Sequence, residues 1–382
     1  MEEKSQQTLT AKRTLKILHV VLSLEPGGME NGVVNVAQIL HGNGFDIYVC
    51  CLEKEGDFAQ RLPDRSKLFV LNKPQGISIK TAFRLSKLIR KIQPQIVHSH
   101  NFGPLIYSSF AKFISPDFKF LHGEHGMIKK EDCGKFKILL RRLCYKRCDL
   151  IHTVSEGLKK YFVEQGFPER KIIAIKNGVD TERFKPQNKQ EARRLMNIHL
   201  DAVVLGIVGR FDTGKRHLAL LQAFEQLADK NKDLHLLMVG DGGTDCKQVK
   251  DFVNASLFKN RIILAGYQKN PVPFYQSMDL LVIPSLKEGF PNVLLESMAC
   301  GVPVLAHPTP GTAETIDPGL NGIIANLEKT EDLKKAIELA ISDVGRLEIM
   351  GKNARIKIER SFSLQSMAEA YAEVYRKLAT EG

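Results

Sequence analysis

The sequence has no tryptophan, and it has no apolar run approaching the roughly 18 residues that a membrane-spanning helix needs. We therefore expect no membrane-spanning segment. Its seven cysteines are odd in number and repeat no spacing, which argues against a disulfide framework and favours a reducing compartment. Aromatic residues make up 7% of the chain and no nucleic-acid-binding module is recognisable, so we expect no nucleic-acid partner.

A metal site is also not expected. Cys144 and Cys148 lie four residues apart on a predicted helix, with Cys133, His122 and His125 upstream. However, no pair of cysteines here has the Cys-x2-Cys spacing that anchors many zinc sites. We expect these thiols to lie half-buried on a helix face.

The second half of the chain lacks the basic surplus that the first half carries. Residues 1–200 hold 34 Lys and Arg but 20 Asp and Glu, a surplus of 14, whereas the net charge of the whole chain is +12. The second half is therefore slightly acidic. A basic surplus points to a partner that carries phosphate, and two halves of different charge favour two domains with different partners.

Apolar runs of strand length alternate with helical patterns along most of the chain. Such strands separated by helices are typical of parallel sheets with helices on both faces. The sequence predicts strands at 16–22, 46–52, 95–99, 119–122, 150–154, 171–175, 203–208, 234–239, 261–264, 279–284, 303–306 and 322–325. It predicts helices at 30–41, 79–92, 104–113, 135–145, 156–165, 217–228, 272–277, 292–299 and 332–342. Each half holds its own set, so we predict an α/β fold of two doubly wound, Rossmann-like domains that face each other across a cleft.

The domain boundaries follow from breaks in these patterns. Residues 184–190 break both the strand and the helix pattern and place a hinge there. We predict a disordered leader at 1–15, which lacks the apolar core of a secretory signal. The two domains then cover 16–186 and 187–362, and a C-terminal helix covers 363–382.

Two loops that follow strands have the composition of phosphate-binding turns. Gly27 and Gly28 precede a helix, where their backbone amides can approach a ligand closely. Arg210 and Lys215 flank a glycine-containing turn, and two cations at a helix start suit a diphosphate. Neither loop has the dinucleotide-binding fingerprint or the P-loop pattern. A plain tight turn and a solvated basic turn are the alternatives.

The most informative segment is EGFPNVLLESMACGVP at 288–303. Proline and glycine bound a helix within it, so Glu288 lies in the loop at the carboxyl edge of the sheet. Amides near Asn292 can hold an anion, while Glu288 and Glu296 can accept hydrogen bonds from sugar and ribose hydroxyls. A nucleotide sugar offers both groups. The alternative is that the two carboxylates only stabilise the start of the helix.

Taken together, these motifs resemble the retaining GT-B glycosyltransferases of family 4, the glycosyl transferases group 1. The resemblance rests on 288–303, on GGME at 27–30, on Gly209-Arg210 with Lys215, on NGVDTERF at 177–184 and on SFS at 361–363. The motifs occur in the family's order and span nearly the whole chain. In this fold the C-terminal helix, which carries Tyr371 and Tyr375, crosses back to the first domain.

The resemblance implies a role for each matching residue. Arg210 and Lys215 would bind the donor diphosphate and neutralise the leaving group, Glu288 would bond the donor sugar, and Glu296 would bond the ribose. Backbone groups would complete the donor site, namely those of Gly28, Gly289, Phe290, Asn292 and Val293. The family retains anomeric configuration without a clear protein nucleophile, and the usual proposal is front-face attack in which the leaving phosphate takes the acceptor's proton. The two-carboxylate geometry of glycosidases therefore does not apply, and we expect no metal cofactor.

The family's reacting histidine falls in the segment HGEHG at 122–126. We favour His125 as the catalytic histidine, alongside Arg210, Lys215 and Glu288, because flanking glycines free that part of the segment to enter the cleft. His122 is the second candidate, and a buried histidine bonded to backbone is the alternative. The segment departs from the family's commoner form. We place His98, His100, Asn101 and His122 on the acceptor side.

The basic surplus lies in the half that receives the acceptor in this family. Residues 80–91 and 135–147 both carry cations around an apolar helical stripe. Such stripes suit an anionic membrane surface, and they also suit a helix that packs on its sheet with a solvated basic face. The second stretch favours membrane contact through its density of Arg and Lys.

The sequence thus predicts a retaining hexosyltransferase, cytoplasmic and peripheral on the membrane. It would move a sugar from a nucleotide diphosphate sugar, with UDP favoured by family frequency, to a lipid-linked, lipopolysaccharide or surface-polysaccharide acceptor. The alternatives are a GT-B nucleotide-sugar epimerase or phosphorylase, and a non-catalytic nucleotide-sugar-binding subunit of a polysaccharide assembly complex. The joint presence of Arg210, Lys215, Glu288 and Glu296 favours an enzyme.

Overall fold

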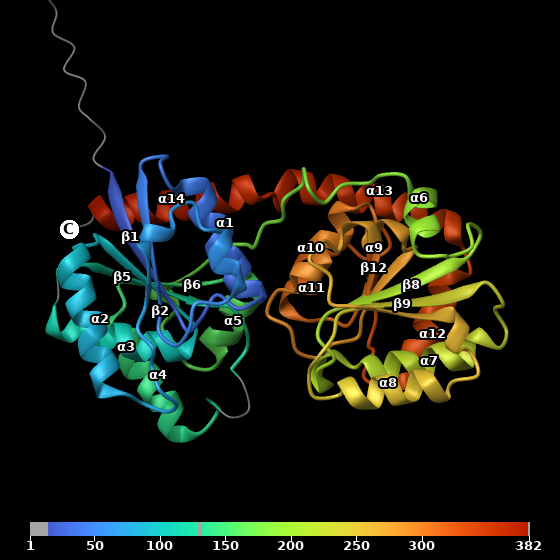
Figure 1. Ribbon diagram of the computed structural model, residues 1–382, viewed down its shortest axis with the longest axis horizontal. Coiled ribbons are helices and arrows are strands. Elements are labelled where there is room, and N and C mark those ends of the chain that lie inside the picture. The colour runs from blue at the N-terminus through green and yellow to red at the C-terminus, as the bar shows by residue number, and fades with distance from the viewer. Residues whose placement is uncertain (1–13, 116, 129–131, 381–382) are drawn as a thin grey trace, which may run out of the picture. The chain divides into compact units, whose positions relative to one another are not determined.

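The computed structural model describes residues 14–115, 117–128 and 132–380 and has helices on both faces of two β-sheets (Figure 1). The predicted leader lies almost entirely outside these residues. Contacts within the described chain define two compact units. Residues 14–124, 132–151 and 368–380 form the first unit, and residues 125–128 and 152–367 form the second. No helix in the described ranges is long and apolar enough to cross a membrane.

The first sheet has seven strands in the order β3-β2-β1-β4-β5-β6-β7. Strands β1 and β4 pair in parallel, with His19 opposite His98. The strand order reverses between them, which is where open α/β sheets bind ligands beyond their carboxyl ends. The strands are β1 (Leu15–Val21), β2 (Phe45–Cys51), β3 (Leu68–Val70), β4 (Ile96–His100), β5 (Lys119–Glu124), β6 (Leu150–Thr153) and β7 (Ile172–Ala174).

Helices in the first half of the chain follow the strands as the apolar periodicity predicts. Helix α2 illustrates the cause, because Ser78 caps its first turn and Leu85, Ile89 and Ile92 are buried on one face. These helices are α1 (Gly28–Leu40), α2 (Ile79–Ile92), α3 (Phe102–Ile114), α4 (Lys135–Arg147) and α5 (Glu156–Glu164). The C-terminal helix α14 (Leu364–Thr380) contributes residues 368–380 to the first unit.

The second sheet has six strands in the order β10-β9-β8-β11-β12-β13, and its order reverses between β8 and β11. Its strands are β8 (Val203–Val208), β9 (Leu234–Val239), β10 (Ile262–Gly266), β11 (Leu280–Ile283), β12 (Val304–Ala306) and β13 (Gly322–Ile324). Its helices are α6 (Lys189–Leu195), α7 (His217–Ala228), α8 (Cys246–Ala255), α9 (Val272–Ser277), α10 (Asn292–Ala299), α11 (Pro310–Thr315), α12 (Thr330–Ile341) and α13 (Val344–Ser361).

A buried ion network ties α6 to the start of β11. The Asp279 carboxylate accepts hydrogen bonds from Arg193 Nη2 and from the Val204 amide, both at 2.6 Å, and it pairs with Lys189. The Arg193 and Asp279 side chains are 5% and 4% exposed. Breaking such a pair on one side leaves an uncompensated buried charge and costs about 3–5 kcal/mol.

The predicted α/β class with two doubly wound sheets is confirmed, and every predicted strand has a counterpart within about two residues. Strand β3 and helices α6, α8, α11 and α13 were not predicted. Helix α6 begins inside the predicted hinge, because the Asn188 side chain caps it by accepting from two backbone amides. The predicted domain boundary at residue 186 stays a prediction. Strands β6 and β7 lie in the first sheet, whereas the contacts within the chain group residues 152–186 with the second unit.

The cysteine prediction needs one correction. Cys144 and Cys148 are buried and not half-buried. Cys144 lies on the buried face of α4 together with Tyr145, and Cys148 follows the helix as its C-cap. Cys133 is exposed.

Candidate active site

Two loops meet at the point where the strand order of the second sheet reverses. Strands β8 and β11 are parallel neighbours, so the loops that leave their carboxyl ends lie side by side. Lys215 closes a short 3-10 turn after β8, and Glu288 follows β11. Lys215 Nζ lies 2.5 Å from Glu288 Oε1, with the two side chains 35% and 15% exposed. The structure thus joins two predicted site residues in an ion pair that a ligand can reach.

Arg210 supplies a second cation in the loop after β8. Its side chain is 70% exposed and lies 3.4 Å from Asp212. The preceding residue, Gly209, has φ +145°, which favours glycine, and a Cβ at Gly240 would lie 2.0 Å from the Gly209 carbonyl oxygen. The two glycines therefore let the loops after β8 and β9 touch and leave Arg210 accessible to an anion.

The amino end of α10 follows the Glu288 loop. The helix begins at Asn292 with Pro291 as its N-cap, and Asn292 and Val293 are half-buried. First-turn amides have no acceptor within their own helix and carry the positive end of the helix dipole. Phe290 is a core residue whose ring lies 5.9 Å from that of Phe362, so its side chain serves packing. This end of the helix offers backbone donors for an anion.

The glycine after Glu288 allows a close approach between two backbone segments. A Cβ at Gly289 would lie 2.7 Å from the His125 carbonyl oxygen and 2.8 Å from Gly126 Cα. His125 is half-buried, and its ring meets the edge of the His152 ring at 5.6 Å. The structure therefore brings the predicted catalytic histidine to the loop that carries Glu288.

Glu296 has a partner that the sequence did not indicate. Its carboxylate accepts a hydrogen bond of 2.7 Å from the Tyr275 hydroxyl on α9. Burial raises the pKa of Glu296, and the hydrogen bond from Tyr275 opposes that rise. Tyr275 lies 21 residues upstream, so no local spacing could have linked the two.

His122 lies in a different environment from His125. It is fully buried at the end of β5, where Nδ1 lies 2.8 Å from Ser99 Oγ and Nε2 donates to Glu124 Oε1 at 3.1 Å. Both ring nitrogens are thus engaged within the first unit. Its predicted acceptor-side role stays a prediction.

His98 and His100 are also buried, together with His19. His19 Nδ1 lies 2.9 Å from His100 Nε2, and His98 Nδ1 lies 2.9 Å from the Tyr375 hydroxyl on α14. The next residue, Asn101, is half-buried with φ +62°, and its amide donates to the Gly123 carbonyl at 2.9 Å. The acceptor-side roles of His98, His100 and Asn101 stay predictions.

These histidines also form a group in the first unit that could hold a metal ion. One ligand atom from each of His19, His98 and His100 lies within 4.8 Å of the other two. In the structure, His19 and His100 contact each other and His98 contacts the Tyr375 hydroxyl. The expectation that the enzyme needs no metal stays a prediction.

Gly28 is the first residue of α1, after β1 in the first unit. Its predicted role in donor binding stays a prediction.

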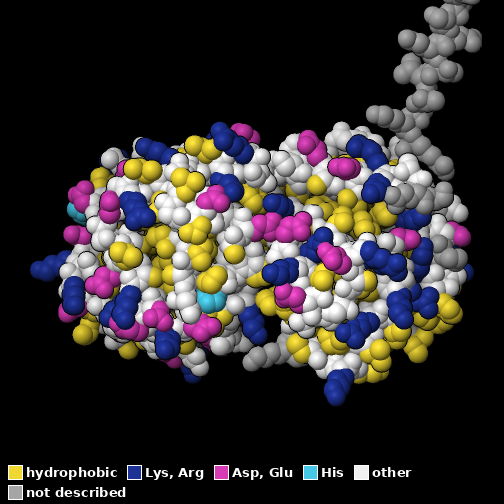
Figure 2. Space-filling view, turned by 180° about the vertical axis from the view of Figure 1, so that it is seen from behind, with side chains coloured by type: hydrophobic (Ala, Val, Ile, Leu, Met, Phe, Trp, Pro, Cys, Tyr) yellow, Lys and Arg dark blue, Asp and Glu magenta, His cyan; other side chains and the backbone are white. Residues whose placement is uncertain are grey.

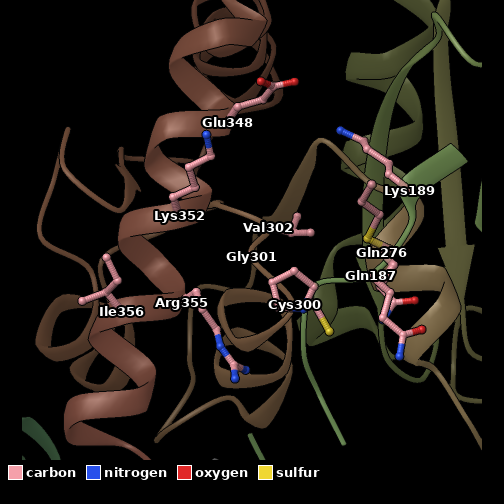
Figure 3. Close-up of a pocket in the computed structure, with 12 residues that line it drawn as sticks. Gln187, Lys189, Gln276, Cys300, Gly301, Val302, Glu348, Lys352, Arg355 and Ile356 are labelled. Atoms are coloured by element: carbon pink, nitrogen blue, oxygen red, sulfur yellow. The ribbon is translucent and has the colours of Figure 1, made fainter. Parts of the chain in front are cut away.

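A pocket of about 430 Å³ lies elsewhere on the second unit (Figure 3). Lys352 and Arg355 extend toward it from α13, opposite Gln187 and Lys189, and Ile356 of the same helix also lines it. It lies where α10 ends and β12 begins, at the amino edge of the sheet, whereas Glu288 follows the carboxyl edge. The pocket includes none of the predicted site residues.

Comparison with known proteins agrees with this geometry. The model of Glycosyltransferase Family 4 matches residues 26–183, and the model of Glycosyl transferases group 1 matches residues 188–357. The GT-B fold and both matching family models place the chain among the glycosyltransferases. The chain belongs to glycosyltransferase family 4, the glycosyl transferases group 1, and is a hexosyltransferase.

Three individual proteins illustrate the relationship. The capsular polysaccharide biosynthesis glycosyltransferase CapM of Staphylococcus aureus is 26% identical over 314 residues, which cover 79% of this chain and 82% of CapM. The UDP-Gal:alpha-D-GlcNAc-diphosphoundecaprenol alpha-1,3-galactosyltransferase of Escherichia coli is 26% identical over 379 residues, or 94% of this chain and 96% of that protein. The crystal structure of Anabaena Alr3699/HepE with UDP and glucose has the same fold, with a TM-score of 0.84 at 19% identity over 95% of this chain and 100% of that one.

Proposed function

We propose that this enzyme transfers a hexose, with retention, from a nucleotide diphosphate sugar to a lipid-linked, lipopolysaccharide or surface-polysaccharide acceptor. UDP is the favoured nucleotide. The observation that carries the proposal is the Lys215–Glu288 pair, which offers a cation for a diphosphate and a carboxylate for sugar hydroxyls at one sheet edge. Two relatives' names support the donor and acceptor classes. The name of the Escherichia coli protein contains UDP-Gal and a diphosphoundecaprenol-linked sugar, and that of the Staphylococcus aureus protein contains capsular polysaccharide.

In this reaction the bond between the anomeric carbon and the phosphate oxygen breaks, and the acceptor oxygen bonds to that carbon on the same face. The acceptor's proton passes to the leaving diphosphate. Arg210 and Lys215 would stabilise the charge that develops on the diphosphate, without a metal. Donor binding would separate Lys215 from Glu288, so that Lys215 contacts phosphate and Glu288 accepts from sugar hydroxyls.

His125 is the histidine that we place at the reaction centre. Its backbone packs against the Glu288 loop at Gly289, and its side chain is half-buried. By contrast, His122 is fully buried and bonded through both ring nitrogens. A buried, doubly bonded imidazole is a poor group to meet a substrate, which favours His125.

Binding of a donor is the direct test. With a panel of UDP- and GDP-sugars, we expect saturable binding by calorimetry and slow hydrolysis of at least one member. The product formed with an acceptor should keep the donor's anomeric configuration in proton NMR. Binding to no member by the folded protein would contradict the donor assignment. An epimerised donor in the absence of acceptor would favour the epimerase alternative, and binding without turnover across many acceptors would favour a non-catalytic subunit.

We further propose that the enzyme works at the cytoplasmic face of the membrane and touches it with α4. Phe136, Leu139 and Leu143 form one stripe along this helix and are 74%, 55% and 49% exposed. Exposed Lys135 and Arg142 lie in the same helix. Apolar side chains mixed with cations suit an anionic lipid surface. Figure 2 shows yellow and dark blue side chains interspersed in the lower part of the half that holds the first sheet.

Helix α2 is a weaker candidate for the membrane. Its apolar residues Leu85, Ile89 and Ile92 are buried against the protein. Its exposed apolar side chains, Ile79 and Phe83 at 70% and 53%, lie only near the start of the helix. Arg141 of α4 also points inward and is 4% exposed, so the surface of α4 carries fewer cations than its sequence indicates.

Vesicle cosedimentation tests this contact. We expect wild-type protein to bind vesicles of phosphatidylglycerol and phosphatidylcholine more tightly than vesicles of phosphatidylcholine alone. The Leu139→Ser/Leu143→Ser variant should lose about tenfold in affinity, because two exposed leucines no longer enter the lipid. The Leu257→Ser/Leu339→Ser variant is the control, since both leucines are exposed in the second unit. Equal partition into both vesicle types would show that α4 is ordinary surface.

A further inference from the structure

A buried carboxylate with three donors ends β5 in the first unit. Glu124 Oε1 accepts hydrogen bonds from the Tyr145 hydroxyl at 2.7 Å, from His122 Nε2 at 3.1 Å and from Arg141 Nη1. The Glu124 and Arg141 side chains are 5% and 4% exposed. The Arg141 guanidinium also lies over the Phe102 ring, 4.4 Å from its centroid. This Glu124 network therefore joins β5 to α3 and α4.

The network holds Glu124 ionised. Burial raises the pKa of the carboxyl, but Arg141 and the hydrogen bond from His122 outweigh burial and bring the pKa to about 2. A carboxylate held ionised in this way is poorly matched to acid–base work near neutral pH. An ion pair in the core is also seldom better for stability than well-packed apolar groups. Stability alone therefore does not explain why an ion pair lies at the end of β5.

The position of Glu124 supplies such a reason. The next residue is His125, whose carbonyl packs against Gly289 beside Glu288. Glycines stand on either side of the Glu124–His125 pair, and glycine leaves a backbone loose unless contacts hold it. Glu124 lies between Gly123 and His125 in the chain. Hydrogen bonds from His122 and from Tyr145 of α4 hold its side chain in place.

We propose that Glu124, held by Arg141, is the positioning residue for His125. The Glu124 network fixes the chain at the end of β5, so that the imidazole of the following residue is presented to the reaction centre in one orientation. This inference rests on the proposed function, in which His125 contacts the donor sugar. Misplacing a catalytic group by about 1 Å can cost 100-fold in rate, so the anchoring matters for turnover more than for binding.

The test uses a variant that removes both charges and keeps the neutral hydrogen bonds. Glu124→Gln/Arg141→Met leaves no unpaired buried charge, so we expect thermal unfolding within a few degrees of wild type. The kcat for transfer, or for donor hydrolysis, should fall at least about tenfold, while the donor KM and the affinity for UDP change by less than about twofold. This split between kcat and KM is not expected from a merely structural role.

The chain offers a matched control in the Asp279 network. Asp279→Asn/Arg193→Met removes a buried acid–arginine pair of the same exposure at the amino edge of the second sheet. Its kcat should remain within about twofold of wild type, whatever the shift in unfolding temperature. An unchanged kcat in the Glu124 variant would overturn the proposal. So would a fall of kcat in both variants in proportion to their loss of unfolding temperature.

A measurement without substrate separates this inference from the proposed function. The imidazole signals of His125, assigned with His125→Gln, should shift or broaden in proton–carbon NMR spectra of the Glu124 variant and stay in place in the Asp279 control. Unchanged His125 signals in the Glu124 variant would overturn the positioning role. If wild-type protein turned over no nucleotide sugar, the proposed function would fail while these spectra still decided whether Glu124 orders His125.

Discussion

Replacing Lys215 or Glu288 by alanine is expected to reduce transfer by about 100- to 1,000-fold and to leave the protein folded. The two side chains reach each other across the loops after β8 and β11 at 2.5 Å and are partly exposed. Exposed ion pairs add little to stability, so unfolding temperatures should change little. The loss in rate arises because Lys215 stabilises charge on the leaving diphosphate and Glu288 orients the sugar. Steady-state kinetics with the identified donor measures it.

UDP binding distinguishes the two roles. Lys215→Ala should weaken UDP binding, because a cation at the diphosphate is lost. Glu288→Ala should leave UDP binding unchanged or make it tighter, because Lys215 is released from its partner. Lys357→Ala and Asp317→Ala serve as controls, since this pair at 2.9 Å is also partly exposed and lies outside the candidate site. Equal weakening of UDP binding by Lys215→Ala and Glu288→Ala would contradict the assignment, as would wild-type turnover in either variant.

Gly289→Ala should reduce kcat by about 100-fold, which would be a large effect for one methyl group. A Cβ at this position would meet the His125 carbonyl oxygen at 2.7 Å and Gly126 Cα at 2.8 Å. Both contacts are with backbone, so neither can be relieved by a side-chain rotation. The segment with His125 or the loop with Glu288 must then shift. Measurements of kcat and of UDP affinity should show lost turnover with UDP binding largely retained.

Gly214→Ala is the matched control for this prediction. Gly214 lies in the loop between Arg210 and Lys215, and a Cβ there would meet nothing within 4 Å. Its φ is also outside the left-handed region. Wild-type activity is therefore expected for Gly214→Ala. Wild-type kcat in Gly289→Ala would show that the approach of His125 to the Glu288 loop is not needed for the reaction.

Much of this protein follows from local sequence pattern. Buried strands such as β8 and β11 are apolar runs, and the loops after them carry Arg210, Lys215 and Glu288. Local pattern was insufficient for short or weakly patterned elements. Strand β3 has three residues, all half-buried, and α13 follows α12 closely along the chain. Strand β3 is too short to stand out. Helix α13 is 18 residues long but weakly patterned, since only five of its residues are buried.

Sequence alone determined the two α/β halves, the family and the loops that carry Arg210, Lys215 and Glu288, because each depends on residues adjacent in the chain. The tertiary structure decided which of those residues meet. Strand order makes β8 and β11 neighbours and so pairs Lys215 with Glu288. Sequence pattern grouped Arg141 with the surface cations of α4, yet it lies inside on Glu124. A buried charge takes its partner from whichever element packs against it, and only the folded chain specifies that element.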